Sequence, residues 1–435
     1  MALGAVSPFF SAIATMYGIL VTLYFFFQIF QSKNQNGAAH KAAIYIASLE
    51  VWLRMNGASL PWEFGKIGCI TFLLLGMLIE RRKDSNPIYF LLLFLFVPAL
   101  LISAPGNLRE FREFITFQLG GTVLLIISLM YFSKRKIPLS HFADLLRYAL
   151  LPIITTLVYI IIRSPSIRDI EFSTGANFAA SAGFGPNQVS TILGLGILII
   201  GFVYLWKLPP LISRNVDLVF LAILIVRALL TFSRGGVVVA FSILILGYLT
   251  TLIYQRRLSF NKFFSFFLLG GIVFGIFSFV NQLTDNALLQ RFRGKPPSSI
   301  RNSERERAAE ISSGRSEIVR TDIEMFLDYP IFGVGLGVSN QLRPEYGYKN
   351  ISHIEQTRLL AEHGLPGLIF LLFIICLPLY TFFSRRGLNQ SIVLIFTLLS
   401  FLTMSHSATR LAVVGLYFGF AFIKVYLENY PLHRQ

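Results

Sequence analysis

The sequence GLPGLIFLLFIICLPLYTFF, residues 364–383, contains no charged side chain over its 20 residues. A helix of that length is about as long as the hydrocarbon core of a bilayer is thick. The rest of the chain has a similar character, because 54% of its 435 residues are hydrophobic and only 14% are charged. Soluble proteins carry roughly 25% charged residues. These observations predict an all-α polytopic membrane protein.

Thirteen apolar segments approach the length of a membrane span, so we expect about 12–13 transmembrane helices in one transmembrane domain, residues 1–435. The segments are 9–30, 42–58, 64–80, 87–103, 111–132, 142–162, 188–206, 214–231, 236–254, 262–282, 359–383, 389–405 and 409–427. The second is the weakest candidate because Glu50 and Arg54 lie within it. These two residues are four apart and can pair on one helix face.

The net charge of +16 does not indicate nucleic-acid binding, because most Lys and Arg lie in short linkers between apolar segments. One set of alternating linkers holds 15 of these cations and the short linkers of the other set hold 7. The richer set is expected to face the cytoplasm. The external face would then carry two longer loops, at 163–187 and 283–352, within the same domain.

The loop 283–352 is the only long polar segment of the chain and is expected to carry short helices. Residues 315–328 have the spacing of an amphipathic helix. Its apolar side would be formed by Val319, Ile323, Phe326 and Leu327.

Three arginines at the external face are candidate anion ligands. Arg234 stands between two apolar segments, where its planar guanidinium suits phosphate oxygens. The neighbouring Gly235 and Gly236 would let a large headgroup approach the backbone. The alternative is a helix-end arginine that only reaches the headgroup region. Arg315 would open the amphipathic helix, where a cation opposes the helix dipole, which favours some other use; Arg320 is a less distinctive candidate.

The segment NISHIEQTRLLAEHGLPG, residues 350–367, places ionisable groups at the mouth of an apolar helix. Ser352 and Glu355 fit a capping box, which predicts that the helix begins at His353. The positive end of the helix dipole would keep that imidazole neutral, as a general base requires. Glu355 is either a capping residue or a catalytic partner, and Arg358 is placed to pair with it.

Two further external residues, His406 and Arg410, lie between the last two apolar segments and are reserve candidates, with Arg410 as an additional diphosphate ligand. His363 precedes a glycine and is interpreted as incidental.

The residue types favour one kind of chemistry. The sequence contains no Asp-x-Asp and no spaced His/Cys/Glu ligand set, so no metal or other cofactor is expected. It contains no G-x-S-x-G, which argues against a serine hydrolase. Fixed arginines stabilise the charge that grows on a departing diphosphate. A neutral histidine can deprotonate an attacking hydroxyl.

Four motifs together resemble the O-antigen ligase and O-antigen polymerase superfamily. In chain order they are GPNQVS (185–190), SRGG (233–236), SGRSEIVRTDIEMFLDYPIFGVGLG (313–337) and SHIEQTRLLAEHGLPGLIFLL (352–372). The resemblance covers about residues 183–383. It implies a metal-independent GT-C type transferase that takes a glycan from undecaprenyl diphosphate at the periplasmic face of the bacterial inner membrane.

The same resemblance assigns roles to individual residues. Arg234 and Arg315 match the arginines that bind the diphosphate, and His353 matches the catalytic histidine. The family usually has Asn after that histidine, whereas this chain has Ile354, so Glu355 becomes the candidate partner.

The acceptor stays open at this point. It would be lipid A–core for a ligase of lipopolysaccharide biosynthesis, a second lipid-linked glycan for a polymerase, or a protein for an O-oligosaccharyltransferase. A transporter or flippase of lipid-linked sugar is the alternative from another class. A transporter would place its charges near the bilayer midplane, whereas the polar groups here gather at one face.

Overall fold

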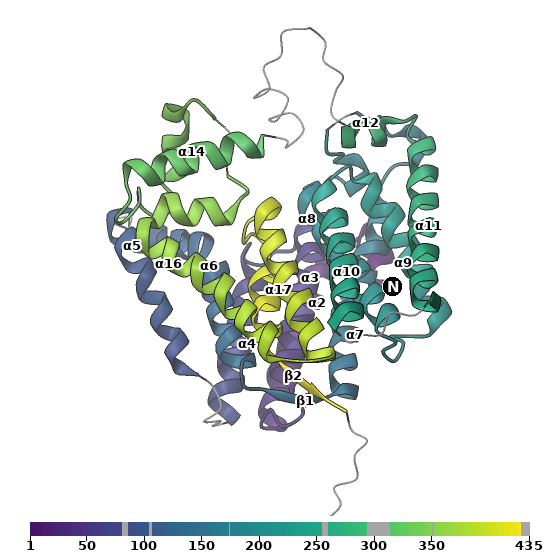
Figure 1. Cartoon of the computed structure of the whole chain (residues 1–435), viewed down its shortest axis with the longest axis horizontal. Helices are drawn as coiled ribbons and strands as arrows, with labels where there is room; N and C mark the ends of the chain where they lie inside the picture. Colours follow the sequence, from purple (N-terminus) through teal and green to yellow (C-terminus); the bar gives the residue numbers. More distant parts are fainter. Residues whose placement is uncertain are drawn as a thin grey trace, which may run out of the picture.

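The computed structural model describes residues 1–80, 86–103, 107–173, 175–254, 260–293, 314–349 and 352–427. Helices dominate this part of the chain, which confirms the all-α class, and the two described strands are three residues long and pair in parallel (Figure 1). In chain order the elements are α1 (Ala2–Val6), α2 (Ala12–Gln31), α3 (Ala38–Met55), α4 (Phe64–Glu80), η1 (Pro87–Phe96), α5 (Val97–Ser103), α6 (Leu108–Phe132), β1 (Lys136–Pro138), α7 (Leu139–Arg163), η2 (Ile167–Asp169), η3 (Ala179–Ser181), α8 (Pro186–Leu205), α9 (Arg214–Leu230), α10 (Arg234–Tyr254), α11 (Phe260–Leu283), α12 (Ala287–Arg293), α14 (Arg315–Asp328), α15 (Ser339–Leu342), η4 (Arg343–Tyr346), α16 (Glu355–Ser384), α17 (Leu388–Ser407), α18 (Ala412–Phe420) and β2 (Lys424–Tyr426).

The protein is multi-pass. In the described residues, seven helices are long and apolar enough to cross a membrane: α2, α6, α7, α8, α10, α16 and α17. The pair Gly270–Leu283 and Ala287–Arg293, bent by 112°, adds an eighth if it is one broken span. The other apolar segments form shorter helices, as in α4, α9 and α18, or carry several ionisable groups, as in α3. By length and composition, the described part of the chain therefore supports seven or eight spans, fewer than the expected 12–13.

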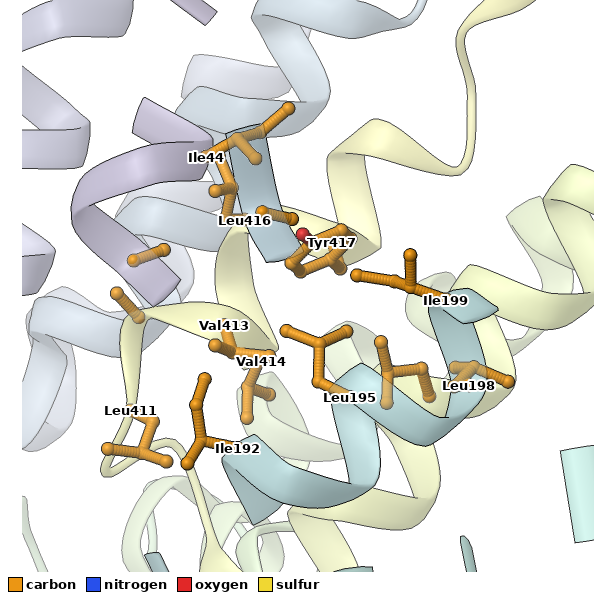
Figure 2. Close-up of a cluster of buried hydrophobic side chains, with 14 of the residues drawn as sticks. Ile44, Ile192, Leu195, Leu198, Ile199, Leu411, Val413, Val414, Leu416 and Tyr417 are labelled. Carbon is orange, nitrogen blue, oxygen red and sulfur yellow. The ribbon is translucent and has the colours of Figure 1, made fainter. Parts of the chain in front are cut away.

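The centre of the core lies between α8, α18 and α3. Ile192, Leu195 and Ile199 of α8 gather with Val414 of α18 and Ile44 of α3 (Figure 2). Although α18 has only 9 residues, all of them are buried. It packs so closely on α6 that a Cβ on Gly419 would lie 2.2 Å from a backbone carbon of α6. The last apolar segment is thus a short enclosed helix.

The described linkers of the two sets lie at opposite ends of the molecule. At one end, here called the basic end, the turns at 32–37 and 133–138 lie with β1 and β2. At the other, here called the site end, the segments 185–190, 231–236 and 408–411 meet the end of α3, because Arg54 donates hydrogen bonds to Gln188 and to the carbonyl of Arg410. Helix α3 joins the two ends, and its 18 residues span about 27 Å.

Helix α16 is kinked at Gly364, which has φ 60° and ψ −135°. The glycine-rich segment 333–337 packs against this kink. The amides of Val334 and Gly335 donate to the carbonyls of Ala361 and Glu362, at 2.9 and 3.2 Å, and so satisfy acceptors that the kink leaves without helical partners. The GVGLG segment is therefore a turn that closes the long loop onto α16.

Candidate active site

The motif SRGG begins α10 and is held by the motif GPNQVS at the start of α8. Ser233 Oγ hydrogen-bonds Asn187 Oδ1 at 2.8 Å. Ser190 Oγ donates to the carbonyl of Ser233 at 2.8 Å and accepts from the amide of Gly236 at 3.1 Å. These bonds fix the turn that precedes Arg234, the first residue of α10. Two motifs that are about 45 residues apart therefore form one structural unit.

The two glycines of SRGG serve helix packing. A Cβ on Gly236 would lie 1.9 Å from the carbonyl oxygen of Ser190, and one on Gly235 would lie 2.3 Å from the ring of His406. The space that the sequence assigned to a lipid headgroup is thus filled by protein. The His406 ring is itself bonded by Thr191 Oγ1 at 3.2 Å and by the carbonyl of residue 402 at 3.1 Å, which gives this reserve candidate a packing role.

A further arginine joins Arg234 at the site end. Arg234 Nη1 donates to the carbonyl of Arg291 on α12 at 3.1 Å, and Arg291 Nε donates to the carbonyl of Phe232 at 3.3 Å. Arg291 lies within electrostatic reach of both Arg234 and Arg315. The sequence did not single out Arg291, because only the bend between α11 and α12 returns it to the SRGG turn.

Helix α14 begins at Arg315 and ends at Asp328, as the sequence predicted. The pKa of Arg315 is lowered, first by burial and then by the positive charge of Arg234. Arg315 therefore lies within electrostatic reach of Arg234. An anion bound beside the partly buried Arg315 would be attracted by both positive charges.

The buried side of α14 differs from the expected one. Ile323 and Leu327 are 41% and 68% exposed, whereas Ile318, Asp322 and Met325 are buried. A polar network determines this face. Asp322 forms an ion pair with Arg343, and both side chains are fully buried. Thr357 Oγ1 on α16 donates to Asp322 Oδ2 at 2.7 Å, so α14 is tied to α16.

Arg320, proposed from the sequence as a diphosphate ligand, is engaged by protein groups. Its guanidinium bonds Glu317 at 3.1 Å, Glu324 at 2.6 Å and the carbonyl of Tyr346 at 3.0 Å. These partners occupy its three nitrogens, so Arg320 braces α14 and is not part of the candidate site.

His353 precedes α16, which begins two residues later than predicted, at Glu355. Ser352 does not cap the helix. Its hydroxyl accepts from the amide of Ile354 at 3.3 Å and donates to the carbonyl of the same residue at 3.2 Å, forming a local turn. The turn is held in place from outside, because the amide of Ala408 donates to the carbonyl of His353 at 3.0 Å. The capping box and the helix-dipole argument for His353 are thus wrong.

The structure nevertheless keeps His353 neutral, for other reasons. Burial, followed by the charge of Arg410, lowers its pKa to about 4, and Arg315 acts in the same direction. His353 Nδ1 lies 3.1 Å from the carbonyl oxygen of Ser352. A carbonyl oxygen can only accept, so Nδ1 carries the proton and Nε2 keeps its lone pair. The ring is held in the tautomer that a general base needs.

A chain of polar contacts connects this turn to α14. Asn340 Oδ1 accepts from the amide of Ser352 at 2.9 Å and from Arg343 Nη1 at 2.7 Å. Arg343 in turn pairs with Asp322 of α14. The helix that begins with Arg315 and the turn that carries His353 are therefore parts of one polar assembly, which the sequence did not reveal.

Glu355 and Arg410 flank His353. Glu355 Oε1 accepts from Arg358 Nη2 at 2.8 Å, which confirms the pairing expected for Arg358. Among the described residues, Glu355 Oε2 is buried without a hydrogen-bond partner. Arg410 lies within electrostatic reach of Glu355 and His353, and no hydrogen bond or ion pair of its guanidinium is found with the residues that the structure describes. Glu355 Oε2 and the Arg410 guanidinium could each form a hydrogen bond with a bound ligand.

The weak second apolar segment, which forms α3, contributes to the site end of the molecule. Arg54 and Glu50 pair at 2.6 Å inside α3, as expected, and are 9% and 2% exposed. Glu50 Oε2 accepts from the amide of Ala412, and Arg54 donates to the carbonyl of Arg410 at 3.3 Å. This charge pair therefore anchors the loop that carries Arg410.

The site as a whole is a group of cations around one neutral histidine. The positive charges of Arg315 and Arg410 both lower the pKa of His353, and the charge of Arg234 lowers the pKa of Arg315. The described residues contain no group of three or more His, Cys, Asp or Glu that could hold a metal ion.

Comparison with known families fits a multi-pass membrane protein of the glycosyltransferase type. Residues 218–372 match the family model described as O-antigen ligase. The match contains Arg234, Arg315 and His353 and supports the resemblance of this part of the chain to the O-antigen ligase and polymerase superfamily. No curated protein matches the chain.

Proposed function

We propose that the protein transfers a glycan from undecaprenyl diphosphate to an acceptor hydroxyl at the site end of the molecule. That end would face the periplasm from the bacterial inner membrane. The observation that carries the proposal is His353, whose Nδ1–H donates to the carbonyl of Ser352 while neighbouring cations and burial keep the ring neutral.

In the proposed reaction His353 Nε2 takes the proton of the acceptor hydroxyl. The hydroxyl oxygen forms a bond to the anomeric carbon of the glycan as the bond from that carbon to the diphosphate oxygen breaks. The electron pair leaves with the diphosphate, which stays attached to its lipid. Arg234, Arg315 and Arg410 would stabilise this charge, with Arg291 beside them.

Glu355 has a supporting role in this proposal. Its Oε2 is buried without a hydrogen-bond partner among the described residues and could accept a bond from a substrate hydroxyl. Its other oxygen is held by Arg358, so the carboxylate is fixed in position.

The test uses purified protein in nanodiscs with a lipid-linked oligosaccharide as donor, in the presence of EDTA. Two acceptors are supplied, lipid A–core and an excess of the same lipid-linked oligosaccharide. A product on lipid A–core identifies a ligase, and a ladder on the carrier lipid identifies a polymerase. If competent substrates give neither product, the proposal fails for these acceptors, and a protein acceptor and glycan transport across vesicles are tested next.

A further inference from the structure

A cavity of about 570 Å³ lies at the basic end, opposite the candidate active site. The turn between α2 and α3 and the turn between α6 and α7 form its walls, with Lys33, Lys136, His40 and His141 among the lining residues. Nothing in the proposed transfer reaction uses this cavity. Helix α3 begins at its edge and ends about 27 Å away at the site end.

Two histidines from different helices meet in the cavity wall. His40 Nε2 and His141 Nε2 are 2.7 Å apart, so one ring donates and the other accepts. His40 Nδ1 bonds the hydroxyl of Tyr131 at 2.9 Å. His40 is 2% exposed and His141 is half-buried, so the pair reaches from the protein interior to the cavity surface.

The charge of the cavity is positive. Among the described lining residues the single carboxylate is that of Glu80, which is held by Arg135 through two bonds of 3.0 and 2.8 Å and by Asn34 at 2.7 Å. Lys33 and Lys136 are exposed, and neither ammonium group has a hydrogen bond or ion pair with the described residues. Of the described residues, three cationic side chains and one carboxylate line the cavity, and these carry a net charge of +2 with both histidines neutral.

Backbone dipoles add to this charge. Helix α3 begins at Ala38 and helix α7 at Leu139, and both first turns border the cavity. Each helix start contributes a partial positive charge. A compact anion with several oxygens could therefore accept bonds from the lysines and a histidine while the Glu80–Arg135 pair forms a neutral wall.

We propose that this cavity is a binding site for a phosphate group, carried by an anionic lipid headgroup or supplied as free phosphate. The proposal does not depend on the transferase function. The competing explanation is that these lysines only add to the general positive charge of a cytoplasmic membrane face. In that case the loss of anion binding should be the same whichever exposed lysine of this face is changed.

The test measures the melting temperature of the full chain in detergent micelles during titration with three probes: dihexanoyl phosphatidylglycerol, dihexanoyl phosphatidylcholine and inorganic phosphate. The variant is Lys33→Gln with Lys136→Gln, and the matched control is Lys134→Gln, an exposed lysine of the same turn that does not line the cavity. Arg234→Gln is titrated as well, because phosphate could bind at the site end.

We expect saturable stabilisation by at least one anionic probe and none by phosphatidylcholine. The probe concentration at half-maximal stabilisation should rise about 30-fold in the double variant, since two lost lysines at roughly 1 kcal/mol each remove about 2 kcal/mol of attraction. It should not change in Lys134→Gln or Arg234→Gln. Stabilisation by phosphatidylglycerol alone identifies a lipid headgroup, and stabilisation by inorganic phosphate identifies the free anion. Equal loss in Lys134→Gln, equal stabilisation by phosphatidylcholine, or no saturation would overturn the proposal.

Discussion

At the scale of single residues, the account depends on His353 being neutral in the resting protein. Its pKa of about 4 predicts how activity varies with pH. The base form is needed, so protonation reduces activity, and the loss should begin only as pH falls toward 4. Because kcat/KM reports groups of the free enzyme, its profile should be flat for this group from about pH 5.5 upward. A transfer assay across pH measures it, and an acid limb centred near pH 6.5 would contradict the structural explanation.

The arginines of α14 give a second prediction at this scale. Arg315 is half-buried and within electrostatic reach of Arg234 and His353. Arg320 is bonded to Glu317, Glu324 and a carbonyl. Arg315→Gln should lower kcat/KM by roughly a hundredfold, as expected for one donor to a charged transition state. Arg320→Gln is the matched control on the same helix and should retain activity to within about threefold, because Arg320 bonds groups of α14 and the long loop and does not act on His353. Equal losses in the two variants would remove Arg315 from the diphosphate site.

At the scale of elements, the contact between α8 and α10 positions Arg234. Gly236→Ala should destabilise the protein by about 1–3 kcal/mol, because its Cβ would overlap the backbone of Ser190. Gly275→Ala in α11 is the control, since a Cβ there meets nothing within 4 Å. Thermal unfolding in detergent measures both. Indistinguishable melting temperatures would show that the crossing of the two helices is looser than the structure describes.

Helix positions were predictable where apolar periodicity determined them and less so where polar contacts did. The bounds of α14 followed from its spacing. Its buried side did not, because the Arg343–Asp322 ion pair, formed with a residue 21 positions away, turns the polar face inward. The start of α16 was misplaced because Ser352 bonds within its own turn instead of capping the helix. Local sequence signals cannot report such distant or competing partners.

At the scale of the whole molecule, the uneven distribution of Lys and Arg predicts which end faces the cytoplasm. Lys134 and Lys349 are both exposed, at the basic end and in the long loop respectively. In a variant without Cys69 and Cys376, a membrane-impermeant thiol reagent should label Lys349→Cys from outside the inner membrane and should not label Lys134→Cys. The reverse pattern would place the candidate active site in the cytoplasm and exclude periplasmic transfer.

The membrane class and the gathering of polar motifs at one face were readable from composition and linker order. The candidate site was predictable only in part. His353, Arg234 and Arg315 were found through motifs, but Arg291 reaches the site through the bend between α11 and α12. The role of Arg54 depends on a hydrogen bond across more than 350 residues. Contacts of that range depend on the packing of the whole chain.

The central claim, that His353 is the general base, is tested most directly by the transfer rate of His353→Ala in nanodiscs with a bound lipid-linked donor. Melting temperature and donor binding are measured on the same sample to show that the variant is folded and loaded. We expect donor binding within about threefold of the unchanged protein and a rate lower by about 10²–10⁴-fold, the usual contribution of a general base. A folded, donor-bound variant that transfers glycan at the normal rate would contradict the assignment.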